Sequence, residues 1–250
     1  MKLGSQFFSI RNLTQTEDGL KEAFRMTKEI GYEVVQLSAI GPIDAHVIKS
    51  YVDEFSLPVV CTHKAYDDIV NNTEKLIEDH QIYECPVIGL GSMPTEFRSS
   101  LEGVTEFINS IKEPIKKIEA AGLKFAYHNH AFEFEQFGGR LIYDMLIEDL
   151  PSLNFILDTY WVKYGGYDYL EYIKRIGSAR MTNVHFKDMK CEPKGDICPC
   201  GTGVIDFKPV ISLCDELGIP NALVEQDNAP ASGDSMGQMK ISFDNLKPLF

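Results

Sequence analysis

The sequence has no long hydrophobic run and no recognisable export signal. No stretch approaches the roughly 18 consecutive uncharged apolar residues that a transmembrane helix needs. The opening segment MKLGSQFFSIRNL lacks both the apolar core and the small-residue cleavage site of a signal peptide. We therefore expect a cytoplasmic protein that has no membrane partner.

Basic residues are also scarce. The 250 residues include 24 Lys and Arg against 37 Asp and Glu, which gives a formal net charge of −13. A surface this acidic repels phosphate backbones and anionic lipids, so nucleic acid is excluded as an expected partner. A small anionic substrate is not excluded, because a local pocket can differ in charge from the surface as a whole.

Three further patterns are missing, and each absence argues against a class of site or architecture. The nearest approach to GxGxxG, GLGSMP at 89–94, lacks the third glycine of a dinucleotide site. Three of the six cysteines, Cys191, Cys198 and Cys200, are spaced C-x6-C-x-C, unlike the paired C-x2–4-C units of structural zinc sites. We expect reduced thiols without metal there. No Pro- or Ser-rich linker interrupts residues 1–250, which favours one domain.

What the sequence does contain is a regular alternation of apolar runs and amphipathic segments. The apolar runs are continuous rather than alternating, as expected for parallel strands that are buried on both faces. The segments predicted to be strands are 3–9, 33–38, 58–63, 85–89, 123–130, 154–158, 181–186 and 222–226.

Glycines mark the junctions between predicted helices and the strands that follow them. One helix is predicted to begin near Thr16, with acidic residues in its first turn, and to end at Gly31, where a left-handed C-cap belongs. The segment 101–121 ends at Gly122 in the same way, and Pro114 is expected to kink or shorten that helix. A strand and helix alternation of this length predicts a single closed (β/α)8 TIM barrel rather than an open doubly wound sheet.

Metal-capable side chains stand at the ends of four consecutive predicted strands. In a barrel of this type the chemistry lies at the C-terminal ends of the strands. Imidazole and carboxylate ligands together suit Mn, Zn, Co or Fe better than Ca. Asp158 alone has an ordinary explanation as a helix N-cap, but capping does not easily explain four such ends. We predict a divalent metal site formed by His128, Asp158, His185 and Glu225.

The segments that carry these residues resemble a known family. YHNHAFEF (127–134), LDTYWVKYGG (157–166), VHFKD (184–188) and VEQD (224–227) are similar to the sugar phosphate isomerase/epimerase family of xylose isomerase-like TIM barrels. The opening LGSQFFSIRN, the segment EIGYEVVQL and the closing KISFDNLKPLF resemble its first strand, second strand and last helix. The resemblance covers nearly the whole chain, and the order and spacing of the motifs make it specific.

The resemblance implies a metal held by Glu, Asp, His and Glu from strands five to eight. Asp158, His185 and Glu225 match this pattern by position, whereas His128 stands in the place of the first Glu. Glu133 is an alternative source of the missing carboxylate. Because many family epimerases are thought to use the first and last carboxylates as acid and base, this departure puts a symmetric two-carboxylate mechanism in doubt.

Further roles are predicted for side chains at the same strand ends. Glu225 is expected to act as the base, with His128 or His130 as its partner. Lys187 is expected to stabilise a developing oxyanion or a substrate phosphate, unless it is an ordinary surface lysine. Tyr160 and Trp161 either stack on a sugar or pack beneath the rim, and Asn129 is also placed to brace the ligands. The predicted substrate-binding residues are His63, Asn129, Tyr160 and Trp161.

The predicted function is a metal-dependent isomerase or epimerase of a sugar or sugar phosphate. Removing a proton beside a carbonyl needs a base, and a metal ion that chelates the substrate oxygens stabilises the resulting enediolate. A lyase that dehydrates a keto-inositol or hydrates a keto-sugar begins with the same intermediate and is the alternative. A nuclease for abasic DNA would need three metals, a basic face and more than the six histidines present.

The expected ligands are one divalent ion, from among Mn, Zn, Co and Mg, and a sugar or polyol. A homo-oligomer and a non-catalytic sugar-binding role stay open.

Overall fold

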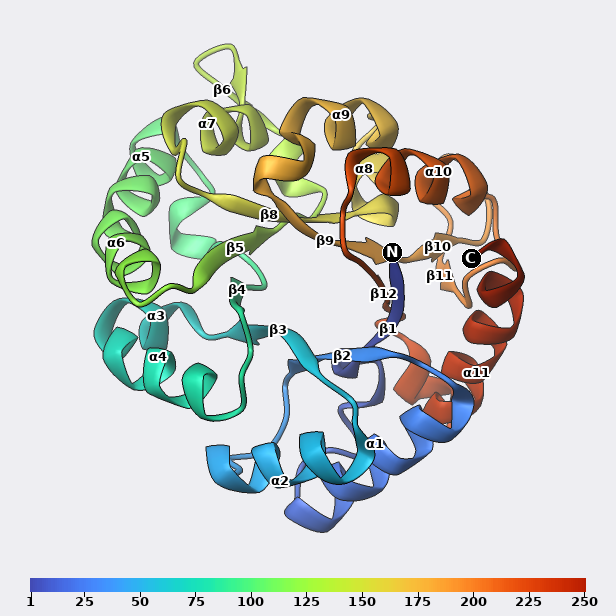
Figure 1. The fold of residues 1–250 in the computed structure, drawn as a ribbon. Helices are drawn as coiled ribbons and strands as arrows, with labels where there is room; N and C mark the ends of the chain where they lie inside the picture. Colours follow the sequence, from blue (N-terminus) through green and yellow to red (C-terminus); the bar gives the residue numbers. More distant parts are fainter.

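The strands form one closed barrel. The computed structural model describes residues 1–250, and its parallel barrel strands follow the order β1-β12-β9-β8-β5-β4-β3-β2 (Figure 1). Because the first strand pairs with the last, the sheet has no open edge. The predicted (β/α)8 barrel is thus confirmed. The barrel strands are β1 Lys2–Gln6, β2 Val34–Ser38, β3 Val59–Lys64, β4 Val87–Leu90, β5 Lys124–His128, β8 Asn154–Asp158, β9 Met181–Phe186 and β12 Asn221–Val224.

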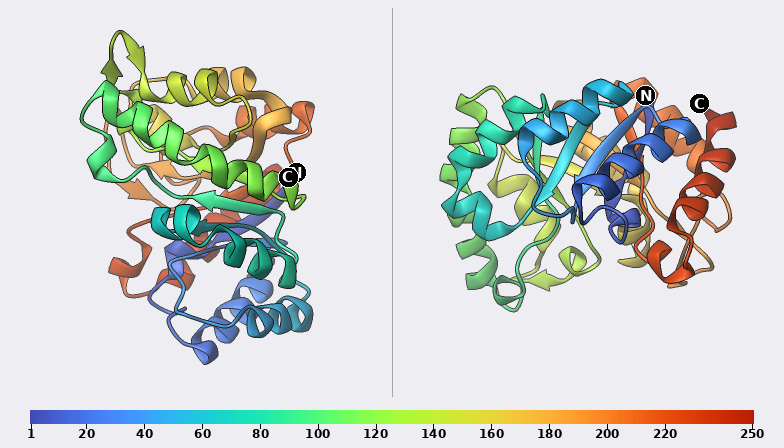
Figure 2. Two further views of the ribbon diagram at one scale, coloured as in Figure 1. Left: turned by 90° about the vertical axis from the view of Figure 1, so that its left-hand side faces the viewer. Right: turned by 90° about the horizontal axis from the view of Figure 1, so that it is seen from below.

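Helices surround the barrel (Figures 1 and 2). The first begins where the side chain of Thr16 accepts a hydrogen bond from the N–H of Gly19, and it ends at Gly31, whose φ of 113° is left-handed. None of the helices is long and apolar enough to span a bilayer. The helices are α1 Glu17–Ile30, α2 Ala45–Phe55, α3 Tyr66–Asn71, α4 Thr73–Ile82, α5 Leu101–Ser110, α6 Lys112–Ala120, α7 Ile142–Asp149, α8 Thr159–Tyr164, α9 Tyr169–Arg180, α10 Phe207–Leu217 and α11 Ser235–Leu246.

Several predicted elements differ in extent from the observed ones, and three of the differences have a local cause. The first strand stops at Gln6, whose side chain accepts from the N–H of Phe8 and starts a short 3-10 helix at Phe7–Ile10. The fifth strand stops at His128 because the next residues turn into a 3-10 helix at Phe132–Phe134. The helix predicted at 101–121 is two helices, α5 and α6. Pro114 lies in the first turn of α6, where its missing N–H costs no intrahelical hydrogen bond.

Loops at the C-terminal ends of the strands carry two small hairpins, β6 Gln136–Phe137 with β7 Arg140–Leu141, and β10 Asp188–Met189 with β11 Ile197–Cys198. The buried carboxylate of Asp188 accepts hydrogen bonds from the N–H groups of Gly201, Gly203 and Ile205. This carboxylate therefore holds the cysteine-bearing loop against the barrel. The thiol of Cys200 in that loop donates to the carbonyl of Phe186, and Cys191 is exposed.

Candidate active site and metal centre

The ends of four neighbouring strands bring four metal-capable side chains together. His128 ends β5, Asp158 ends β8, His185 lies in β9 and Glu225 directly follows β12. The pairing register places Asp158 beside His185 across the β8–β9 ladder. One donor atom from each of the four lies within 4.8 Å of the others, and all four side chains are buried. The structure thus gathers the four predicted ligands into one cluster.

The two histidines of the cluster each have one ring nitrogen held by an outside acceptor. His128 Nδ1 is 3.0 Å from the carbonyl oxygen of Gly91, which can only accept, so Nδ1 carries the hydrogen. His185 Nε2 is 2.8 Å from Gln36 Oε1, and the amide nitrogen of Gln36 is directed to Ser38 Oγ. A neutral imidazole carries one ring hydrogen, so in the neutral form His128 Nε2 and His185 Nδ1 would present lone pairs to the cluster. Burial opposes protonation of His128, but the carboxylates of Asp158 and Glu225 outweigh it and raise the pKa of His128.

This donor set fits a divalent metal ion. His185 Nδ1 lies 2.8 Å from Glu225 Oε2, and His128 Nε2 lies 3.3 Å from Asp158 Oδ2. A lone pair facing a carboxylate oxygen at such a distance is repulsive unless a proton or a cation lies between them. Metal-bound histidines usually donate their other ring N–H to a carbonyl or carboxylate, which is the arrangement found for His128. His128, Asp158, His185 and Glu225 would hold the ion.

Lys187, from the loop after β9, brings a buried ammonium into the same cluster. Its Nζ lies 3.0 Å from Asp158 Oδ2, 3.0 Å from Glu225 Oε2 and 3.0 Å from Asp227 Oδ1. Although burial opposes ionisation, Lys187 and His185 bring the pKa of Glu225 well below its ordinary value. The carboxylates in turn raise the pKa of Lys187 well above its ordinary value, even though burial acts in the opposite direction.

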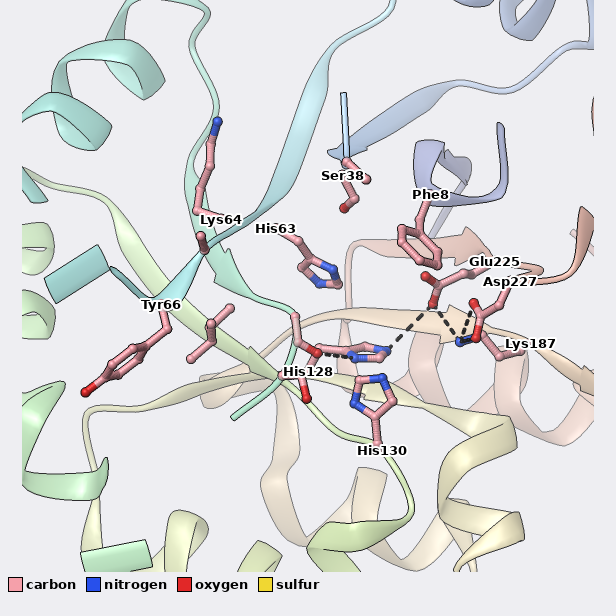
Figure 3. A pocket seen from close by; sticks show the side chains of 15 residues that line it. Phe8, Ser38, His63, Lys64, Tyr66, His128, His130, Lys187, Glu225 and Asp227 are labelled. Carbon is pink, nitrogen blue, oxygen red and sulfur yellow. Dashed lines mark hydrogen bonds and ion pairs between the residues drawn. The ribbon is translucent and has the colours of Figure 1, made fainter. Parts of the chain in front are cut away.

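A cavity of about 340 Å³ opens beside the cluster (Figure 3). His63 and His130 lie on its wall, and each has a buried ring nitrogen without a hydrogen-bond partner, Nε2 in His63 and Nδ1 in His130. Burial lowers the pKa of both imidazoles well below the ordinary value, so both are neutral at pH 7. The cavity is lined by Phe8, Ser38, Ala39, His63, Lys64, Ala65, Tyr66, Leu90, Gly91, Ser92, His128, His130, Lys187, Glu225 and Asp227.

Three of the predicted substrate-binding residues lie outside this lining. The hydroxyl of Tyr160 donates to the carbonyl of Gly195, in the loop after β10. Trp161 packs beside Lys187 and His130, with its ring centroid 5.3 Å from Lys187 Nζ and 5.2 Å from the ring centroid of His130. Asn129 Oδ1 accepts from the backbone N–H of Asp158, which is the bracing role considered from the sequence.

Glu133 lies apart from the cluster and does not replace the missing carboxylate ligand. Its Oε1 accepts from the hydroxyl of Tyr127 at 2.6 Å, and its Oε2 accepts from the backbone N–H of His130 at 2.8 Å. Both oxygens are therefore engaged in shaping the segment after β5. Of the two candidates for the place of the first Glu, the cluster includes His128 and leaves out Glu133.

Sequence reasoning missed Asp227, Gln36 and several residues of the cavity wall. Asp227 stands two residues after Glu225, so the strand-end criterion could have identified it. Gln36 carries a weaker signal, a polar residue inside the continuous apolar run of β2. Phe8, Ser38, Lys64, Tyr66 and Ser92 had no distinguishing pattern, because they come from strand ends, a loop and two short helices that only the closed barrel brings together.

The comparisons with known proteins agree with this fold. A family model described as xylose isomerase-like TIM barrel matches residues 24–240. A search of curated proteins finds no match.

Solved structures from two bacteria are similar over nearly the whole chain. A sugar phosphate isomerase/epimerase from Parabacteroides distasonis has a TM-score of 0.81 at 21% identity, covering 99% of this chain and 98% of its own. A second one from the same organism has a TM-score of 0.77 at 21% identity, covering 98% and 93%. A probable 3-DHS dehydratase involved in petrobactin synthesis in Bacillus anthracis has a TM-score of 0.73 at 14% identity, covering 96% and 98%. At these identities the likeness shows the fold.

Proposed function

Because the chain belongs to the xylose isomerase-like TIM barrel family, we propose that it is a metal-dependent enzyme that isomerises or epimerises a small sugar or sugar phosphate. The observation that carries the proposal is the buried cluster in which ring nitrogens of His128 and His185 face the carboxylates of Asp158 and Glu225. The likeness to sugar phosphate isomerase/epimerases supports the reaction class.

The side chains around the cavity have the chemical properties that proton transfer at carbon requires. A bound divalent ion supplies a Lewis acid beside the substrate oxygens. Glu225 is ionised and faces the cavity, so it removes the proton from the carbon next to the substrate carbonyl. The low pKa of Glu225 keeps its carboxylate charged but also makes it a weaker base. Lys187 donates to the oxygen that gains charge. His63 and His130 offer neutral ring nitrogens to substrate hydroxyls.

Hydrogen exchange at substrate carbon tests this function. The purified full-length chain, after measurement of its metal content, is incubated in D2O with keto-sugars and inososes, and NMR follows deuterium entering carbon. We expect exchange in the wild type and a loss of at least about 100-fold in Glu225→Gln, because a positioned base contributes about that much. Glu119→Gln, which removes an exposed carboxylate on α6, is the control and should exchange at the wild-type rate.

Two outcomes would contradict parts of the proposal. Full exchange after the metal has been removed with EDTA contradicts metal dependence. Exchange that survives Glu225→Gln assigns the base elsewhere, and His130 is then the first candidate because its unpartnered ring lines the cavity.

A lyase is the second candidate, and one observation favours it. Elimination of water needs a base for the carbon-bound proton and a cation or proton donor for the departing hydroxide. The cavity offers the carboxylate of Glu225 and the ammonium of Lys187, with 3.0 Å between oxygen and nitrogen, instead of two carboxylates. The structural likeness to a dehydratase agrees with this reading. The same NMR experiment distinguishes the two by the structure of the product, because an isomerase only rearranges the substrate whereas a lyase removes water from it or adds water to it.

A further inference from the structure

Lys187 lies between three carboxylates, and only two of them belong to the candidate metal cluster. Asp158 and Glu225 are members of that cluster, whereas Asp227 is not. All three have an oxygen 3.0 Å from Lys187 Nζ. Figure 3 shows the ammonium between Glu225 and Asp227 at one wall of the cavity. One of the three contacts is therefore independent of the metal ligands.

The ammonium and a divalent ion would compete for the same oxygen atoms. Asp158 Oδ2 faces Nε2 of His128, and Glu225 Oε2 faces Nδ1 of His185, so both oxygens are directed into the cluster. These are also the two oxygens that contact Lys187. Two cations held at the same oxygens repel each other, and more strongly in a buried site than in water. An ion bound in the cluster therefore weakens the electrostatic attraction of Asp158 and Glu225 for the Lys187 ammonium.

Asp227 offers Lys187 a position away from the ligands. Its two carboxylate oxygens lie 3.0 and 3.2 Å from Lys187 Nζ. Its backbone carbonyl accepts two hydrogen bonds of 3.1 Å from the guanidinium of Arg11, which hold the residue at the rim. Because the Lys187 side chain is only 1% exposed, its ammonium needs a carboxylate partner to stabilise its charge.

We propose that Asp227 is a positioning residue that holds the Lys187 ammonium away from the metal ligands, so that the ammonium and a divalent ion occupy the site together. The proposal rests on the proposed metal site. Asp227 acts through Lys187. When Asp227 loses its charge, the ammonium has only Asp158 and Glu225 as partners and competes with the ion for them.

A double-mutant cycle with metal affinity as its readout tests this role. Isothermal titration calorimetry measures Mn²⁺ binding to the EDTA-treated full-length chain as wild type, Asp227→Asn, Lys187→Met and the double variant. We expect Asp227→Asn to weaken binding about 100-fold in the wild-type background, the upper part of the range for groups that support metal ligands. In the Lys187→Met background the same change should weaken binding about 10-fold or less, because only the direct attraction of Asp227 for the ion is then lost. Asp227→Glu keeps the charge and should restore most of the affinity.

The outcomes separate this proposal from the proposed function. Equal fold-changes in the two backgrounds contradict the positioning role of Asp227 and leave the metal site intact. Absence of Mn²⁺ binding by the wild type contradicts the metal-dependent function, and the positioning role with it. Circular dichroism checks the fold of each variant. If Lys187→Met does not fold, Lys187→Gln takes its place in the cycle, because its amide still donates to the carboxylates.

Discussion

His128 stands on β5 where the family resemblance implies a carboxylate. An imidazole can ligate a metal ion but brings no negative charge, so the cluster has two carboxylates and a formal charge of −2, where three carboxylates would give −3. A bound ion keeps more of its Lewis acidity in the less negative site. The hydrogen bond from Nδ1 to Gly91 directs Nε2 of His128 into the cluster.

His128→Ala should therefore weaken metal retention at least about tenfold, as expected for loss of a ligand rather than of a supporting group. The measurement is metal content after dialysis against a series of chelator concentrations. His46→Ala, which removes an exposed histidine on α2, is the matched control and should retain metal like the wild type. A His128→Ala protein with full metal content and full turnover would mean that this histidine only packs in the barrel mouth.

The segments that follow β4 and β5 are joined by one buried carboxyl group. Glu133 accepts from the hydroxyl of Tyr127 and from the N–H of His130, and the same hydroxyl accepts from the N–H of Met93 after β4. The network sets the position of His130 on the cavity wall. Burial raises the pKa of Glu133 to about 7, although Tyr127 and the backbone of His130 act in the opposite direction.

This pKa predicts a dependence of stability on pH. A carboxyl with a raised pKa in the folded state stabilises the fold fully below its unfolded pKa of 4.5, and that stability is lost as the pH rises through about 7. A shift of this size corresponds to about 3 kcal/mol. We expect the free energy of unfolding of the wild type to fall by about that amount relative to Glu133→Gln between pH 4.5 and 8, measured by urea unfolding. A difference between the two proteins that does not change with pH would contradict the assignment.

At the scale of the whole molecule, charge governs which large partners the protein can approach. The net charge of −13 is spread over a barrel whose candidate site takes up one mouth. Most non-specific affinity for DNA comes from neutralising phosphates, which this surface opposes. We expect no measurable binding to duplex DNA at physiological salt and no retention on a heparin column. Retention at ordinary salt would contradict this prediction and favour a nucleic-acid function on the same barrel.

The sequence by itself determined the barrel and the positions of the four clustered side chains. The apolar runs and the glycines that end the helices are local features of the sequence. A strand that is buried on both faces is a continuous apolar run at any position in the barrel, so it can be recognised without knowing the fold. Parallel strands in a barrel also share one C-terminal rim, so Asp158, His185 and Glu225 could be grouped from their strand-end positions alone. His128 joined that group for the same reason.

Only the tertiary structure decided which neighbouring side chains face the cavity. Tyr160 and Trp161 come only two and three residues after Asp158, yet both lie outside the lining because they belong to α8, where successive side chains point in different directions. Glu133 was the alternative to His128 as the source of the missing ligand, and only the structure shows that its carboxylate binds the hydroxyl of Tyr127 instead. The link between Lys187 and Asp227 joins residues 40 positions apart. Such contacts depend on how the closed barrel and its loops pack, and no local pattern in the chain encodes that packing.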